Sequence, residues 1–178
     1  DCQLATNGIV TPEVLDAFGK VPREIFLPEK FRHTAYLDED IRLAKNTFCM
    51  EPLVHARLIE AAAPDRKDSV LNIGDMTGYS SAILSDLVST VVVLESSIGV
   101  LDDARKAWDA LNYCNIAVVR GKEIEGSPEH APYDLIIING SVVEIPSVLL
   151  EQLAEGGCLV TVLKKPDEPP KKTKKDPV

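Results

Sequence analysis

The chain has 178 residues, a length typical of one domain, and its 45% hydrophobic and 26% charged residues are enough to build a core. No apolar run approaches the ~18–20 residues of a membrane-spanning helix, so we expect no transmembrane segment. The net charge of −9 is uneven, because residues 164–178 hold six lysines against three acidic residues, about +3, which leaves about −12 elsewhere. An acidic body repels nucleic acid, so we expect no nucleic-acid partner.

The cysteines and histidines are scattered along the chain without a CxxC pair. Zinc sites need paired ligand spacing, so we predict no metal site. A disulfide framework is not expected in a chain of this size either, which indicates a reducing compartment such as the bacterial cytoplasm. These residues are Cys2, Cys49, Cys114, Cys158, His33, His55 and His130.

Residues 1–67 are predicted to form an N-terminal helical part. Thr11 and Pro12 open a first helix, because Thr caps free N–H groups and Pro fits the first helical position. A second helix is expected from Pro52 to about Ala63, and His55, one turn into it, is expected on its surface. The stretch 24–46 lacks strong periodicity and is predicted as loop with short elements.

From Asp68 onward, short apolar runs alternate with helical stretches. Strands separated by helices indicate βαβ units, hence an α/β fold with a Rossmann-like, doubly wound parallel sheet and helices on both faces. Residues 68–163 would form this core, 1–163 one domain, and 164–178 a Lys/Pro-rich tail that is solvated or docks on an acidic partner. The expected strands are 69–73, 91–94, 116–119, 134–138 and 158–163, and the expected helices 79–87, 100–111 and 147–154.

The turn after the first of these strands carries the main functional signal. Gly74 and Gly78 allow the backbone to approach a ligand, as in nucleotide cradles. Glu95 ends the next strand 21 residues after Gly74, where a carboxylate can accept hydrogen bonds from both hydroxyls of a ribose. Asn139 ends the fourth strand, where ligands of such sheets lie. A glycine turn also occurs in α/β proteins that bind nothing there.

Several short motifs follow one another as in the protein-L-isoaspartate O-methyltransferases, and the chain resembles that family, especially its alphaproteobacterial branch. The resemblance implies a class I methyltransferase fold, S-adenosyl-L-methionine as methyl donor, and methylation of the α-carboxyl of isoaspartyl residues in damaged proteins. It also implies weaker cofactor contacts from Asp75, Met76 and Thr77. The motifs are Gln3-Leu4, Val21 to Glu24, Phe26 to Pro28, Glu51-Pro52, Gly74 to Tyr79, Leu94-Glu95, Pro132 to Asp134 and Leu153 to Gly157.

The cofactor motif departs from the family pattern of acidic-x-Gly-x-Gly-x-Gly. Asn72 stands at the acidic position and Met76 at the central glycine. A methionine has volume there, and its Cβ forbids backbone torsions that only glycine adopts. Lys122 stands where many methyltransferases place an acidic residue near the adenine amino group, and it cannot accept a hydrogen bond.

The substrate loop departs as well. Aligned on Pro52, the family's Thr-x-Ser-x-Pro becomes Phe48, Cys49, Met50 and Glu51; Thr47 could slide into the first position, but no serine can fill the second. An anionic carboxylate needs positioning more than acid–base help, and hydroxyl groups supply that positioning. We therefore predict no catalytic residue in this loop, which contains Thr47, Phe48 and Met50.

The family continues past its fifth strand into two more strands, whereas here Leu163 leads into Lys164, Lys165 and Pro166. The expected order is then 3-2-1-4-5, with the strand Cys158–Leu163 at an edge. An apolar edge invites pairing with another chain, so a protein partner is expected on this edge or on the basic tail.

Two main hypotheses remain open. The first is a degenerate, non-catalytic protein that acts as a structural or accessory subunit of a larger assembly. The second is an active, divergent methyltransferase that binds S-adenosyl-L-methionine through Gly74, Gly78 and Glu95. A ligand-binding sensor without turnover is a third reading.

Overall fold

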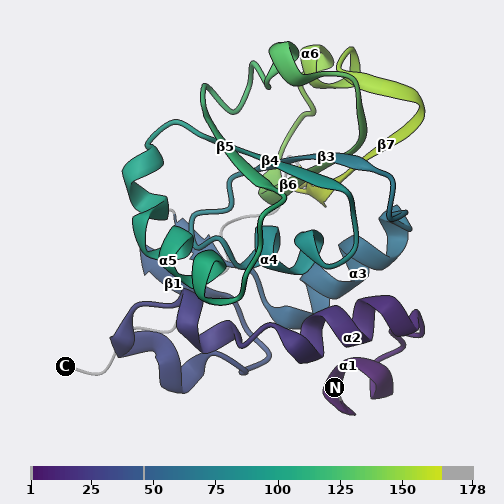
Figure 1. Cartoon of the computed structure of the whole chain (residues 1–178). Coiled ribbons are helices and arrows are strands. Elements are labelled where there is room, and N and C mark those ends of the chain that lie inside the picture. The colour runs from purple at the N-terminus through teal and green to yellow at the C-terminus, as the bar shows by residue number, and fades with distance from the viewer. Residues whose placement is uncertain (1, 46, 166–178) are drawn as a thin grey trace.

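A five-stranded parallel sheet forms the centre of the protein (Figure 1). The computed structural model describes residues 2–45 and 47–165, and of Cys2 and Ile98 only the backbone. The strand order β5-β4-β3-β6-β7 is the predicted 3-2-1-4-5, and it confirms the Rossmann-like α/β fold. The strands are β3 (Ser69–Ile73), β4 (Thr90–Glu95), β5 (Ile116–Arg120), β6 (Tyr133–Val142) and β7 (Leu153–Leu163).

Both faces of the sheet are covered, but by layers of unequal size. Side chains alternate between the faces of a strand, so Val70 and Val91 join one core cluster while Leu71 and Val92 join another. The thicker layer holds α1 (Cys2–Thr6), α2 (Pro12–Lys20), α3 (Pro52–Ala62), α4 (Tyr79–Ser85), η3 (Ile98–Leu101) and α5 (Asp102–Ala110). The thinner layer holds η4 (Pro128–His130) and α6 (Ser147–Leu150), which lies at the top of Figure 1.

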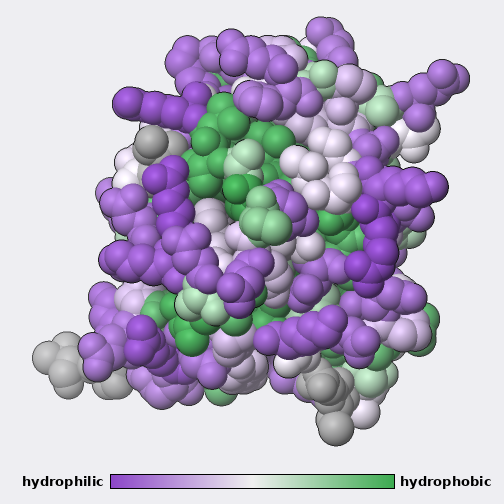
Figure 2. All heavy atoms as spheres, viewed as in Figure 1, coloured by the Kyte–Doolittle hydropathy of each residue, from purple (hydrophilic) through white to green (hydrophobic). Residues whose placement is uncertain are grey.

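The connection from β5 to β6 contains only the short η4, and β5 is an outer strand of the sheet. Ile116, Val118 and Val119 are therefore only partly buried. Figure 2 shows hydrophobic residues gathered over the place where Figure 1 labels β5 and β4, with hydrophilic residues around them. Among the described residues, no helix has both the length and the apolar character needed to cross a membrane.

The N-terminal part is not wholly helical, so that prediction was incomplete. An antiparallel hairpin of β1 (Ile41–Ala44) and β2 (Thr47–Cys49) lies between η1 (Arg23–Phe26), η2 (Glu29–Thr34) and α3. Strands of three and four residues are too short to show a clear period of two. The hairpin is held by a small buried cluster to which Ile41 and Cys49 contribute.

One predicted helix end and one predicted strand start were also wrong. The helix expected over 147–154 ends at Leu150, and β7 already begins at Leu153. Gly156 and Gly157, which precede the expected strand 158–163, lie inside β7, where the pairing with β6 jumps from Tyr133–Leu153 to Leu135–Cys158. Gly156 has a φ of +80°, which a residue with a side chain rarely adopts. The glycine therefore accommodates this irregularity within the strand.

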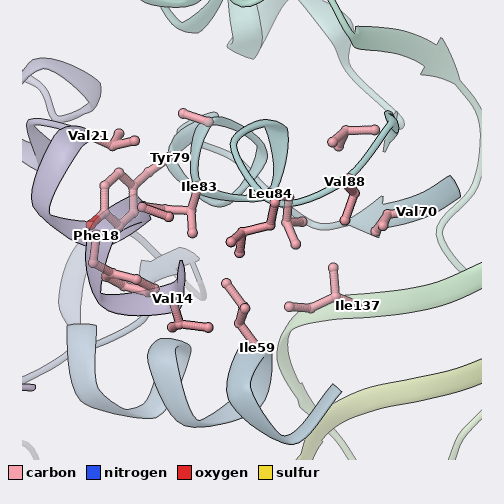
Figure 3. Packing of buried hydrophobic residues seen from close by; sticks show 14 of the residues in the cluster. Val14, Phe18, Val21, Ile59, Val70, Tyr79, Ile83, Leu84, Val88 and Ile137 are labelled. Carbon is pink, nitrogen blue, oxygen red and sulfur yellow. The ribbon is translucent and has the colours of Figure 1, made fainter. Parts of the chain in front are cut away.

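Helices α2, α3 and α4 pack on the sheet through the main core, shown in Figure 3. Phe18 of α2 meets the ring of Tyr79 from α4 at a centroid distance of 6.2 Å. Ile59 of α3 and Ile83 of α4 are both 0% exposed, next to Ile137 of β6. This packing fixes where α4 begins, and α4 begins directly after the glycine turn.

Ile83→Ala removes buried methyl groups at the centre of this core and leaves a cavity. We expect the free energy of unfolding to fall by about 2–5 kcal/mol, measured by urea denaturation. Val100→Ala, at a side chain that is 40% exposed, is the matched control and should change it by less than about 0.5 kcal/mol. Equal losses for both variants would contradict the assigned core.

Candidate functional site

The turn between β3 and α4 keeps glycine torsions at two positions. Gly74 and Gly78 have φ values of +74° and +78°, while Met76 is not among the residues with positive φ. The expectation that Met76 would conflict with a glycine-only torsion was therefore wrong. Met76 sits in the turn with an ordinary backbone, and only its side-chain volume distinguishes it from glycine.

Gly78 is required by helix packing. A Cβ at this position would lie 2.4 Å from the Cβ of Ala104 and 2.7 Å from Cζ2 of Trp108, both on α5. The indole Nε1 of Trp108 also donates a hydrogen bond of 2.9 Å to the carbonyl of Gly78. A cofactor contact at Gly78 stays a prediction, while its close contact with α5 explains the glycine by itself. At Gly74 a Cβ would meet only the carbonyl of Asn139, at 3.5 Å.

The polar groups of the turn bond to one another. The buried Asp75 carboxylate accepts hydrogen bonds from the N–H groups of Gly78 (2.9 Å) and Ser81 (2.7 Å). It also accepts from the Ser81 hydroxyl at 2.6 Å and from the Asn72 amide at 3.2 Å. Burial raises the pKa of Asp75, and these hydrogen bonds oppose that rise. Asn139 completes the network by donating to Asn72 and to the carbonyl of Ile73.

A small cavity of about 20 Å³ lies next to this network, with room for about one water molecule. The glycine turn, the end of β2 and Met50 form much of its walls. It is lined by Arg23, Phe48, Cys49, Met50, His55, Gly74, Asp75, Met76, Thr77, Tyr79, Ser80 and Asn139.

His55 was expected on the helix surface, and that expectation was wrong. Its side chain is 2% exposed, and Nε2 lies 3.0 Å from the hydroxyl of Ser80. Its ring contacts those of Phe18 and Tyr79 at centroid distances of 5.3 and 5.8 Å. Burial, aided by the charge of Arg23, lowers the pKa of His55 to about 3, so the imidazole stays neutral. The spacing from His55 to Ile59 along α3 could have indicated the inward face.

A larger hollow of about 490 Å³ opens at the carboxyl ends of β3 and β6. Asn139 lines both this hollow and the small cavity, although it lies inside β6, which runs on to Val142, rather than at the end of the strand as expected. Phe48 lines both as well, with a side chain that is 48% exposed. The other residues around the hollow are Ile73, Gly74, Glu123, Ile124, Ile138, Gly140, Ser141, Val142, Glu144, Pro146, Leu149 and Lys164.

Glu95, at the end of β4, is 1% exposed, and its Oε1 has no hydrogen-bond partner among the described residues. Burial raises the pKa of Glu95 to about 7, with further contributions from the nearby Glu123 and Asp75 carboxylates. A buried acceptor without a donor suits a ligand with hydroxyl groups, so the ribose end of S-adenosyl-L-methionine fits this chain. The methionine end does not fit in the same way, because the polar groups of the turn are already bonded to each other. In the described residues, no three His, Cys, Asp or Glu side chains gather into a metal site.

Gly78→Ala combines a strained backbone with a collision against α5. We expect it to lower the free energy of unfolding by about 2–5 kcal/mol in urea denaturation. Gly99→Ala, where a Cβ meets nothing within 4 Å, is the control and should have little effect. If Gly78→Ala is as stable as that control, the packing role assigned to Gly78 is incorrect.

The raised pKa of Glu95 makes stability depend on pH. The unfolded chain releases this proton near 4.5 and the folded protein near 7, so stability through Glu95 is lost as pH rises between these values. Urea denaturation at pH 5 and pH 8 should show a larger loss for the native chain than for Glu95→Gln, whose side chain does not titrate. Parallel pH profiles would contradict the buried, unpartnered carboxylate.

Comparison with known proteins agrees with this fold. The family model for protein-L-isoaspartate(D-aspartate) O-methyltransferase matches residues 2–176. A protein-L-isoaspartate O-methyltransferase of Synechococcus sp. (strain JA-2-3B'a(2-13)) is 40% identical over 158 residues, which is 89% of this chain and 65% of the relative. One from Koribacter versatilis (strain Ellin345) is 35% identical over 167 residues, 94% of this chain and 75% of the relative.

Solved structures show the same architecture. A protein-L-isoaspartate O-methyltransferase superposes with a TM-score of 0.75 at 28% identity, covering 90% of this chain and 53% of its own. A putative family member from Plasmodium falciparum, solved with S-adenosyl-L-homocysteine, has a TM-score of 0.78 at 17% identity, over 93% of this chain and 83% of its own, and it supports the fold alone. The chain belongs to the protein-L-isoaspartate(D-aspartate) O-methyltransferase family.

Proposed function

We propose that this chain is a non-catalytic member of its family that acts as a structural or accessory subunit of a larger assembly. The main support for this proposal comes from the substrate loop around Phe48 and Met50. Phe48 and Met50 occupy the positions of the family's two hydroxyl side chains, and both lie on the walls of the cavities beside the glycine turn. Neither side chain donates a hydrogen bond to a carboxylate, so the group to be methylated has no anchor at these two positions.

The glycine turn supports the same proposal. The cofactor's ammonium group needs a free acceptor near the end of β3, and Asn72 is uncharged and fully buried there. The carboxylate of Asp75 is 4% exposed and already accepts hydrogen bonds from Gly78, Ser81 and Asn72. Binding the ammonium would require some of these bonds to break, which costs about 1 kcal/mol or more for each.

The alternative is an active S-adenosyl-L-methionine-dependent methyltransferase acting on isoaspartyl or other protein carboxylates. The unpartnered Oε1 of Glu95 and the 490 Å³ hollow favour it, because they suit the ribose and leave room for a bound cofactor. The relatives from Synechococcus and Koribacter carry the name of that activity. The chain covers 65% of the first relative's length, so activity over the whole protein is itself a proposal.

The partner of the proposed subunit remains a prediction. In the described sheet β7 is an outer strand, and Cys158, Leu159 and Val160 are partly exposed on it. This edge suits strand pairing with another protein. The second predicted docking element, the basic tail, lies beyond residue 165 outside the described residues. A reducing compartment such as the cytoplasm stays an expectation.

A methyl-transfer assay separates the two proposals. With labelled S-adenosyl-L-methionine and an isoaspartyl peptide, we expect no transfer above background, because neither the carboxylate nor the ammonium group finds its anchor. The quadruple variant Phe48→Thr, Met50→Ser, Asn72→Asp, Met76→Gly returns the family's residues to the loop and the turn, including the acidic position, and should gain measurable transfer. The Synechococcus relative is the positive control. Transfer by the native chain at the relative's rate would overturn the proposal.

Cofactor affinity gives a second, independent test. Titration calorimetry with S-adenosyl-L-homocysteine should give no binding in the micromolar range. Micromolar binding that is lost in Glu95→Gln would instead support the alternative, because it would show that the ribose acceptor is in use. Native mass measurement of the protein from its source should show it within a larger particle, whereas a lone monomer would count against the subunit role.

A further inference from the structure

The motif Val21 to Glu24 places an arginine in the interior of the protein. Arg23 lies in η1 and is 1% exposed, one of the largest fully buried side chains of the described residues. Its Nη2 donates to the carbonyl of Met50 at 2.6 Å and contacts Sγ of Cys49 at 3.2 Å. Its Nε and Nη1 have no hydrogen-bond partner among the described residues. Three of the five guanidinium N–H groups are therefore unpaired.

The positive charge of Arg23 also lacks a counter-charge. Within the described residues the ion pairs are Lys106–Asp103 and Lys122–Glu125, and neither involves Arg23. Its guanidinium carbon lies 4.9 Å from the centre of the Tyr79 ring, which offers only a partial attraction. A buried charge is unfavourable unless an opposite charge and hydrogen bonds compensate it, so this site calls for an anion.

The neighbours of Arg23 do not supply that anion. The carboxylate of Asp75 lines the same cavity, but its oxygens are turned to Gly78 and Ser81. Burial raises the pKa of the Cys49 thiol despite the nearby guanidinium, so the thiol is not a ready counter-ion. His55 is neutral and adds no second positive charge.

The cavity beside Arg23 sets the size of the missing group. Its volume of about 20 Å³ has room for about one water molecule, so a single-atom anion suits it better than an extended organic one. The Ser80 hydroxyl on its wall already lies 3.0 Å from Nε2 of His55, so the free donors at the cavity are those of Arg23. We propose that this cavity is a buried anion site in which Arg23 binds a single chloride-sized anion. The cavity shares Phe48, Met50, Gly74 and Asp75 with the candidate cofactor and substrate site, but thermal unfolding reports on a bound anion separately from methyl transfer.

Thermal unfolding at constant ionic strength tests the site, with chloride as the probe and gluconate, too large for the cavity, as its replacement. A ligand that binds only the folded state raises Tm with its concentration. We expect Tm to rise by about 2–5 °C when 300 mM gluconate is exchanged for chloride. Arg23→Met, which keeps the volume but removes the charge, should lose this rise. Arg66→Met, at an exposed arginine, should keep it.

Equal Tm values in chloride and gluconate, or a chloride effect that survives in Arg23→Met, would overturn the proposal. If Arg23→Met does not fold, crystals of the native chain grown in bromide decide the question. An anomalous peak within hydrogen-bond distance of the Arg23 guanidinium supports the site. A water molecule there, with bromide only on the surface, refutes it.

Discussion

The Asp75 carboxylate holds the start of α4 to the end of β3, and much of the candidate site depends on it. It accepts hydrogen bonds from two backbone N–H groups at the start of α4 and from the Ser81 hydroxyl. A buried carboxylate is stable only when it has such donors. The hydrogen bonds that fix the turn occupy the oxygens of the Asp75 carboxylate. Little acceptor capacity therefore remains there for a ligand.

The two ends of the candidate cofactor site differ in how their polar groups are satisfied. At the end of β4, Glu95 is buried and its Oε1 has no hydrogen-bond partner among the described residues. This arrangement is expected of a residue that accepts hydrogen bonds from the hydroxyl groups of a ligand. At the end of β3, Asn72, Asp75 and Asn139 satisfy one another. The hollow at the ends of β3 and β6 is lined by Phe48, at a position where the family presents a hydroxyl group. Family membership accounts for the sheet, and in our proposal these local differences decide the chemistry.

The sequence predicted the sheet well, because each buried strand is a short apolar run between turn residues; β3, for instance, has the predicted bounds Ser69–Ile73. It could not show that Trp108 explains Gly78, since that contact joins the start of α4 to α5, about 30 positions later in the chain. It missed the burial of Arg23 and His55, because polar residues give no apolar periodicity. It overstated the conflict at Met76, because torsions follow from the whole turn rather than from one residue type.

In our account, the polar groups of the turn at the end of β3 form hydrogen bonds with one another rather than with the methionine end of a cofactor. A crystal structure of the chain soaked in S-adenosyl-L-homocysteine tests this directly. We predict that the Asp75 carboxylate keeps its hydrogen bonds to Gly78 and Ser81 and that no homocysteine group lies against Gly74. A ligand whose ammonium group has taken the place of those bonds, with Met76 displaced, would contradict the account.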